Sequence, residues 1–302
     1  MGDLIVSLAG TEAGEALALA LVLLSALAHA IFGAINKGGV DPFLNRGAIN
    51  VCYGIIVAPF ALFVVPWPSG PLWAMLAVSY LVHIAYEWLQ ASSFEKGDFT
   101  LVYPIARGTG PIVSMAMALV VFSERFSIGQ WLGGALLSFS IIGLAVVNIQ
   151  RAKAAGRQLR GLNGAILTAL ATGVMVAVYT MVDAYGIRLA DDPFTFLAWF
   201  FFTGAFGFPV IAALRWRRMP LKPPVRDLAL RGFFGGIIAL MSFGAVMLAM
   251  RLGSVGEAAA LRETSIIFAT AIGVLIFHEE MDRSRLALIG GIAAGAILVE
   301  LG

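Results

Sequence analysis

Hydrophobic residues occur along the chain in long runs that are separated by short polar breaks. A run of about 20 apolar residues is the length that an α-helix needs to cross the hydrocarbon core of a bilayer. Ten such runs are present, at residues 15–35, 47–66, 71–92, 99–121, 128–149, 162–185, 194–214, 227–250, 254–277 and 284–301. The pattern therefore predicts an all-α membrane protein with ten transmembrane helices.

The composition supports this prediction and narrows the possible functions. Of the 302 residues, 60% are hydrophobic and 13% are charged, whereas a soluble domain carries about 25% charged residues. The single cysteine, Cys52, excludes an internal disulfide. No enzyme signature, cofactor motif or metal-binding spacing is recognised. We therefore expect a lipid-embedded protein that is not an enzyme and that uses no cofactor or metal.

The two halves of the chain resemble each other weakly. A shift of 156 residues places Glu124 on Glu280 and Arg107 on Glu263. Since five spans is an odd number, a repeat of five spans must be inverted in the membrane, as it is in many secondary transporters. The longest hydrophilic loop is the basic linker 151–160. It separates a first five-helix repeat (1–150) from a second five-helix repeat (161–302).

Positively charged residues are concentrated in alternate loops. The loops after the odd-numbered spans hold fourteen Lys and Arg residues, Arg46 among them, and the opposite loops hold three. Because positive charge stays on the cytoplasmic side, we expect both termini to face outward from the inner membrane. The basic segment Arg215–Arg226 is interpreted as a collar that faces cytoplasmic lipid, and not as a nucleic-acid site.

The fourth span contains residues that a lipid-facing helix would not tolerate. Pro104 and Pro111 lack the backbone N–H, and Gly108 and Gly110 lower helix propensity, so we expect this span to kink and to act as a gate. Between these residues lies Arg107, whose guanidinium does not discharge by losing its proton. An ionisable residue at membrane depth indicates a functional site, and a structural ion pair is the alternative.

Several spans carry polar or aromatic residues at helical spacing, so that each has one polar face. The most economical arrangement turns these faces toward a shared cavity near the bilayer midplane, where transporter sites usually lie. The members are Ser25, His29, Phe32 and Asn36 on span one, Tyr80, His83, Glu87 and Gln90 on span three, Tyr103, Arg107, Gly110 and Ser114 on span four, and Thr172, Tyr179 and Asp183 on span six. On span nine, Arg262 and Glu263 reach about the same depth.

Each of these residues also has a structural interpretation. His29 and His83 could be core histidines whose ring nitrogens bond to carbonyl groups. Glu87 and Glu263 could serve only to neutralise the arginines of spans four and nine. Glu124 lies at the end of a span, where a helix-capping role is the simpler interpretation.

A fixed cation and several carboxylates in one cavity favour a small polar substrate such as an amino acid. Arg107 or Arg262 could bind a carboxylate in a bidentate manner, while Glu87, Asp183 or Glu263 could face an ammonium group. Glu87 and Glu263 could also carry protons. The aromatic walls would come from Tyr80, Tyr103, Tyr179 and Trp88. A non-transporting membrane component, such as a channel or an assembly or lipid-handling scaffold, is the alternative.

Two segments resemble those of a known family. Residues 103–111 read Tyr-Pro-Ile-Ala-Arg-Gly-Thr-Gly-Pro and precede Glu124, and residues 261–265 read Leu-Arg-Glu-Thr-Ser and precede Glu279 and Glu280. Together they are similar to EamA-type members of the drug/metabolite transporter superfamily. The resemblance implies inverted five-helix repeats around a central cavity, and export or uptake of small metabolites, amino acids among them, by alternating access. The chain departs from the family at Phe32-Gly33, where relatives often have Trp-Asn, and in its orientation, since relatives are usually drawn with cytoplasmic termini.

Overall fold

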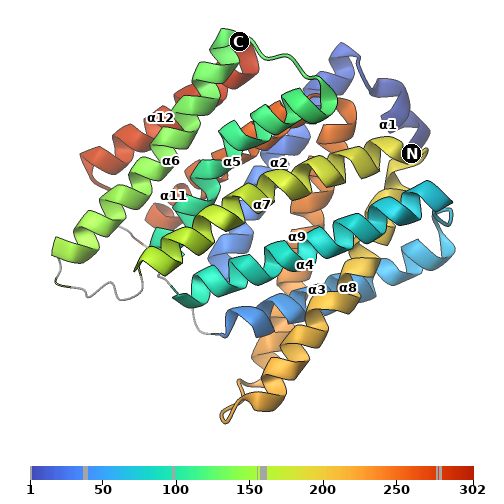
Figure 1. Ribbon diagram of the computed structural model, residues 1–302, viewed down its shortest axis with the longest axis horizontal. Helices are drawn as coiled ribbons and strands as arrows, with labels where there is room; N and C mark the ends of the chain where they lie inside the picture. Colours follow the sequence, from blue (N-terminus) through green and yellow to red (C-terminus); the bar gives the residue numbers. More distant parts are fainter. Residues whose placement is uncertain are drawn as a thin grey trace.

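The protein is a bundle of long helices (Figure 1), and its computed structural model describes residues 2–36, 40–96, 99–154, 156, 162–276, 278 and 281–302. Within these residues there is no β-strand. The elements are α1 (Gly2–Leu8), α2 (Glu12–Asn36), α3 (Pro42–Phe63), α4 (Gly70–Lys96), α5 (Phe99–Phe122), α6 (Ile128–Ala154), α7 (Leu162–Leu189), α8 (Pro193–Arg218), α9 (Val225–Leu252), α10 (Val255–Leu261), the 3₁₀ turn η1 (Arg262–Thr264), α11 (Ser265–Leu275) and α12 (Arg283–Leu301).

Ten segments of the described chain are long and apolar enough to cross a membrane. The segments are α2 to α9, the combined α10–η1–α11 segment, and α12. The predicted all-α fold with ten spans is therefore confirmed. The short helix α1, which was not predicted, packs against α8 and α9.

Every span of the first half packs against a span of the second half. Five pairs that join the two halves are α3 with α8, α6 with α12, α2 with α9, α4 with α7, and α5 with α10. Figure 1 shows α6 beside α12 at one side of the bundle and α3 beside α8 at the other. This set of pairs is unchanged when each span is exchanged for its counterpart in the other half. The pairing is therefore consistent with two related five-helix repeats.

Small residues allow some of these pairs to approach closely. A methyl group at Gly133 of α6 would meet the carbonyl oxygen of Gly295 on α12 at 2.7 Å, and one at Gly47 of α3 would meet Ala212 of α8. Helices in lipid associate through such close backbone contacts, because the apolar solvent provides no hydrophobic driving force between them.

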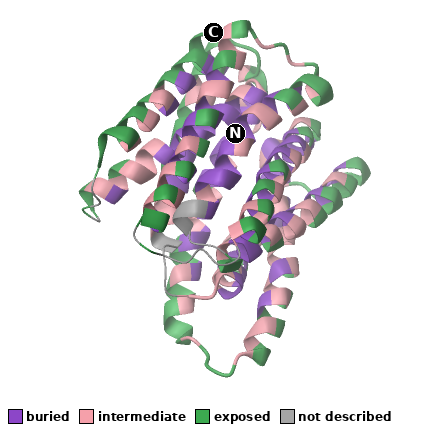
Figure 2. Ribbon diagram, turned by 60° about the vertical axis from the view of Figure 1, so that its left-hand side comes forward, coloured by how far each residue is buried: buried purple, intermediate pink, exposed green. Residues whose placement is uncertain are grey.

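Buried residues lie in the interior of the bundle, and exposed residues lie on the surface that would face lipid. Figure 2 shows buried residues concentrated toward the middle of the bundle and exposed residues on its outer faces. Large apolar side chains such as Ile55, Val120 and Leu167 are exposed, as expected for positions that contact lipid. The polar side chains of the interior are described below.

The interruption of the membrane helices lies in the ninth span and not in the fourth. α5 continues as a helix through Pro104 and Pro111, so the predicted break in span four is not present. α5 is enclosed by α6, α7 and α10, and such neighbours can support a transmembrane helix at its prolines. The ninth span, in contrast, changes from α10 to a 3₁₀ turn at Arg262–Thr264 before α11 begins.

Candidate functional site

The charged and polar residues predicted to share a cavity are mostly buried inside the bundle. Seven His, Arg, Asp and Glu side chains within the spans of the described chain are less than a tenth exposed: His29, His83, Glu87, Arg107, Asp183, Arg262 and Glu263. They come from α2, α4, α5, α7 and η1. The structure therefore gathers polar faces in the interior as the sequence pattern predicted, and the ion pairs and hydrogen bonds among them define the site.

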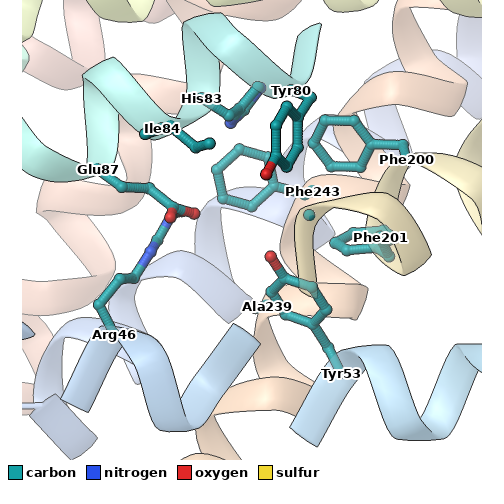
Figure 3. A pocket seen from close by; sticks show the side chains of 11 residues that line it. Arg46, Tyr53, Tyr80, His83, Ile84, Glu87, Phe200, Phe201, Ala239 and Phe243 are labelled. Atoms are coloured by element: carbon teal, nitrogen blue, oxygen red, sulfur yellow. Dashed lines mark hydrogen bonds and ion pairs between the residues drawn. The ribbon is translucent and has the colours of Figure 1, made fainter. Parts of the chain in front are cut away.

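The first polar cluster joins α3 and α4 (Figure 3). An Arg46 guanidinium nitrogen lies 2.8 Å from a Glu87 carboxylate oxygen. The Asn50 side chain donates to the other oxygen at 2.9 Å. The two side chains of the ion pair are only 12% and 6% exposed. Glu87 is therefore neutralised by Arg46, and not by an arginine of span four or nine.

The prediction that Arg46 is a free loop charge was wrong. Helix α3 begins at Pro42, because the Asp41 side chain accepts hydrogen bonds from the N–H groups of Phe43 and Leu44 and so caps the helix. Arg46 consequently lies in the second helical turn and points inward. The spacing of Arg46, Asn50 and Tyr53 is that of a polar helical face and could have revealed this cluster.

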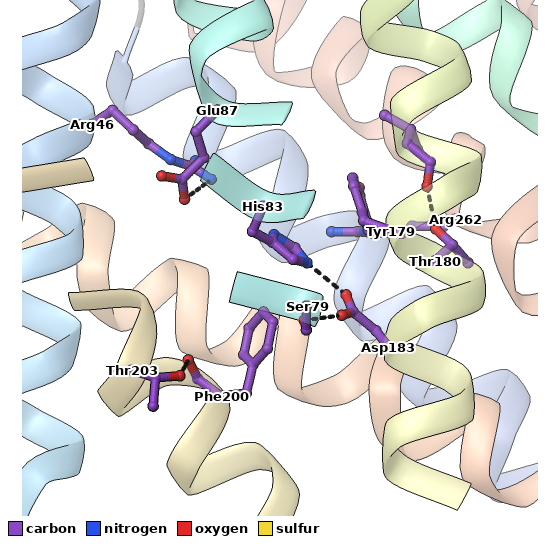
Figure 4. Close-up of polar contacts among 11 residues, drawn as sticks. Arg46, Ser79, His83, Glu87, Tyr179, Thr180, Asp183, Phe200, Thr203 and Arg262 are labelled. Atoms are coloured by element: carbon purple, nitrogen blue, oxygen red, sulfur yellow. Dashed lines mark hydrogen bonds and ion pairs between the residues drawn. The ribbon is translucent and has the colours of Figure 1, made fainter. Parts of the chain in front are cut away.

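The second cluster joins α4 and α7 (Figure 4). His83 Nε2 lies 2.8 Å from one oxygen of Asp183, and the Ser79 hydroxyl donates to the other at 2.6 Å. The His83 ring packs against Tyr179 and Phe200, with ring centroids 4.8 Å apart in both pairs. The histidine is thus fixed between a carboxylate and aromatic rings, in a way that links the two halves of the chain.

The third cluster joins α5 and the ninth span. Arg107 Nε lies 2.8 Å from Glu263 Oε2, and both side chains are almost fully buried. A second nitrogen of Arg107 donates to the Ser265 hydroxyl at 3.2 Å. Arg107 is therefore held in an ion pair, which was the structural alternative to a direct substrate contact.

Arg262 follows a different pattern. Its guanidinium donates to the hydroxyls of Tyr179 at 3.5 Å and Ser242 at 3.4 Å, and it lies 4.6 Å from the centroid of the Phe243 ring. Among the residues that the structure describes, no carboxylate lies within ion-pair distance of it. Arg262 is thus a buried cation whose contacts are all with neutral groups.

Three adjoining cavities follow these clusters through the bundle. The largest, about 330 Å³, is lined by Phe32, Pro42, Arg46, Glu87, Gln90 and Phe94 among others. The second, about 30 Å³, shares Arg46 and Glu87 with the first and is also lined by Tyr53, Tyr80, His83 and Phe243. The third, about 10 Å³, shares Phe243 with the second and is lined by Arg107, Tyr179, Asp183, Arg262 and Glu263. The two inner cavities have room for about one or two water molecules each.

A few of the predicted site residues lie elsewhere. Trp88 is 49% exposed and lines none of the three cavities, because it follows Glu87 and therefore faces about 100° away from it on α4. The expectation that Trp88 supplies a wall was wrong. His29 is buried between the rings of Phe32 and Tyr103, with centroids 6.2 and 6.3 Å away, and is not among the residues that line these cavities. The side chain of Asn36 lies outside the described residues.

The four residues of the predicted gate have different environments. Pro104, Pro111 and Gly108 are buried within a continuous helix. A methyl group at Gly108 would meet the Ile142 side chain at 2.7 Å, so this glycine allows α5 to approach α6. A methyl group at Gly110 would lie 3.5 Å from a Glu263 oxygen, so Gly110 lies where α5 passes the charged residues.

The capping interpretation of Glu124 is confirmed. Its carboxylate accepts hydrogen bonds from the N–H groups of Val255 at 2.9 Å and Gly256 at 3.0 Å, and from the Ser254 hydroxyl at 2.9 Å. It therefore satisfies the free N–H groups at the start of α10. Its counterpart Glu280 lies outside the described residues.

The comparisons with known proteins agree with this architecture. A solved crystal structure superposes with a TM-score of 0.71 and 17% sequence identity, over 96% of this chain and 98% of that one. At this identity the similarity shows the fold alone. No curated protein matches the sequence significantly. Residues 163–301 match the family described as the EamA-like transporter family. The second half of the chain, which carries Arg262 and Glu263, therefore matches a transporter family of the drug/metabolite transporter superfamily.

Proposed function

We propose that the protein is a secondary transporter that exports a small polar metabolite of the amino-acid class by alternating access. The observation that carries the proposal is the row of three adjoining cavities, whose walls bear buried groups of both charges. A zwitterionic substrate needs a cation and an anion within a few ångströms, and the innermost cavity offers Arg262 and Asp183.

The sizes of the cavities support alternating access. The largest cavity includes Val40 and Pro42, so it lies at the end of the bundle near the loop between α2 and α3. The inner two are too small for an amino acid. A transporter that exposes its site to one side at a time is expected to have one wide and one narrow end in any single state.

The direction of transport follows from the predicted topology. The loop between α2 and α3 is on the side to which the positive-inside rule assigns the cytoplasm. The widest cavity would then receive substrate from the cytoplasm, which supports export. A channel would need a path that is open at both ends, and a scaffold would have no need for buried charges that line cavities.

Counterflow in proteoliposomes tests this function. Vesicles that contain the purified protein and an unlabelled mixture of L-amino acids should transiently accumulate the same labelled amino acids from outside, with saturation. A channel would give flux without counterflow, and a scaffold would give no flux, so either result would reject the proposal. An imposed pH gradient in the same vesicles tests the expected proton coupling, which predicts accumulation above the equilibrium level.

A matched pair of variants relates the flux to the cavity. Asp183→Asn removes the charge of a buried residue that lines the innermost cavity. Asp191→Asn makes the same chemical change at an exposed position just after α7. Counterflow should fall strongly in the first variant and stay unchanged in the second. Equal activity of the two variants would contradict a role of the cavity in transport.

A further inference from the structure

Arg262 differs from the other inward-pointing arginines of the described chain in having no counter-ion. Arg46 and Arg107 each lie 2.8 Å from a carboxylate oxygen, of Glu87 and Glu263 respectively. Arg262 is 4% exposed, which is no more than Arg107, yet the groups around it are two hydroxyls and an aromatic ring. Figure 4 shows it next to Tyr179 and on the far side of His83 from the Arg46–Glu87 pair.

The contacts of Arg262 leave part of its hydrogen-bonding capacity unused. Its two hydroxyl contacts are 3.4 and 3.5 Å long, whereas charge-assisted N–H···O bonds are about 2.7–2.9 Å. Its Nε atom is buried and has no hydrogen-bond partner. A buried cation without a counter-ion is energetically unfavourable, so this position is stabilised by any anion that can reach it.

The backbone at Arg262 is also exceptional. Arg262–Thr264 forms a 3₁₀ turn between α10 and α11, and a 3₁₀ stretch within a long helix often marks a functional hinge. The turn directs two neighbouring side chains to different helices. Glu263 pairs with Arg107 on α5, while Arg262 contacts Tyr179 on α7 and Ser242 on α9.

We propose that Arg262 is the receptor for the carboxylate of the transported substrate, and that Arg107 is not. This inference rests on the proposed transport function and deepens it, because it restricts the substrate to molecules with a carboxylate. The planar guanidinium binds a carboxylate through two parallel N–H···O bonds. Arg107 cannot do so without losing Glu263, whereas Arg262 exchanges only two long contacts with neutral hydroxyls.

The aromatic ring of Phe243 determines how a substrate reaches Arg262. This ring covers the guanidinium and lines both inner cavities. A rotation of the ring joins the two cavities and uncovers Arg262 to a molecule beside His83. Asp183 also lines the innermost cavity and can meet the ammonium end of the same substrate.

The test compares an amino acid with its amide, which has nearly the same shape but no negative charge. Counterflow of labelled L-amino acids is measured in proteoliposomes with either unlabelled compound as the competitor. The wild-type protein should require at least about tenfold more amide than acid for half-inhibition. In Arg262→Gln this preference should disappear, and the acid should bind about ten- to a hundredfold more weakly. Arg262→Lys should keep part of the preference, because it retains the charge but lacks the planar fork.

Arg251→Gln is the matched control. Arg251 lies at the end of α9, is partly buried, and donates to the carbonyl oxygen of Arg188, away from the three cavities. This variant should keep the wild-type preference for the acid. An unchanged acid-to-amide ratio in Arg262→Gln would overturn the proposal, and so would a wild-type protein that does not distinguish acid from amide.

Two further results separate a failure of this inference from other failures. If Arg262→Gln does not fold, the wild-type ratio and Arg262→Lys decide the question. If the wild-type protein gives no counterflow, the proposed transport function is rejected. Arg262 can then still be tested by ligand binding. The melting temperature of the detergent-solubilised protein is measured with the amino acid and with its amide, and the two increases are compared. A larger shift with the acid in the wild-type protein but not in Arg262→Gln supports the carboxylate site, and equal shifts reject it.

Discussion

The buried ion pair between Arg107 and Glu263 permits a quantitative test of how charge is balanced inside the bundle. The atoms Nε and Oε2 are 2.8 Å apart, and the side chains are 6% and 3% exposed. Arg262, the neighbour of Glu263 in the chain, also interacts electrostatically with its carboxylate. Glu263 is thus paired with Arg107 and attracted at longer range by Arg262, which is not within ion-pair distance of it, so the two neutralising substitutions should not be equivalent.

Glu263→Gln should be more destabilising than Arg107→Gln. Removing one partner of a buried pair costs about 3–5 kcal/mol. The Coulomb energy of two unit charges about 4 Å apart, at an effective dielectric constant near 20, is of the same size, about 4 kcal/mol. Glu263→Gln removes the ion-pair partner of Arg107 and also the longer-range attraction to Arg262, so its loss should lie at the upper end of this range. Arg107→Gln leaves Glu263 beside Arg262, so its loss should be smaller by at least about 1 kcal/mol.

The free energies of unfolding are measured for the detergent-solubilised variants by thermal or chemical denaturation. The double variant Arg107→Gln/Glu263→Gln should lose less than the sum of the two single losses, by at least about 1 kcal/mol. Arg151→Gln is the control, because its ion pair with Asp282 is about 40% exposed and such pairs contribute less than about 1 kcal/mol. Equal losses for the two single variants, or losses no larger than that of the control, would refute the reasoning.

The remaining predictions concern packing, capping and orientation. Gly108→Ala should lower stability by about 1–3 kcal/mol, because the new methyl group would meet a side chain of α6 at 2.7 Å. Gly110→Ala has only an ordinary contact at 3.5 Å, so its melting temperature should stay the same or rise. Glu124→Ala should lower the unfolding free energy by about 1–2 kcal/mol, because the start of α10 loses its acceptor; an unchanged melting temperature would contradict this. With the native cysteine replaced by serine, cysteine at Gly302 should react with an impermeant maleimide on intact cells and cysteine at Ala154 should not; the reverse labelling would contradict the predicted orientation.

The positions of the spans could be predicted because the thickness of lipid sets their length. The predicted span 99–121 is helix Phe99–Phe122 in the structure, and 254–277 corresponds to Val255–Leu275. The start of the second span was placed too late, at residue 47 instead of Pro42. Hydropathy counts the charge of Arg46 against a membrane position and cannot register that Glu87 neutralises it. Without Arg46, the orientation still rests on thirteen positive charges against three.

The break in the ninth span could not be predicted from residue types. The prolines and glycines of span four gave a strong local signal, yet α5 continues through them because three helices enclose it. Residues 262–264 include neither proline nor glycine. Their 3₁₀ turn is accompanied by contacts that depend on the fold, such as the ion pair of Glu263 and a hydrogen bond from the Thr264 hydroxyl to the Leu261 carbonyl at 2.7 Å. Tertiary interactions therefore override local propensity in both spans.

The polar faces were also predictable, but the partners of the charges were not, and the partners determine the mechanism. Arg46–Glu87 lies within the first half of the chain, whereas His83–Asp183 and Arg107–Glu263 each join one half to the other. If the halves move against each other during transport, the first pair travels with one half and the other two must lengthen or change partners. Breaking a buried pair is strongly unfavourable, unless another charge replaces the lost one. A zwitterionic substrate carries both charges, so it can replace the lost partners of the pairs that the movement breaks. We therefore expect the movement to occur readily only when the substrate is bound.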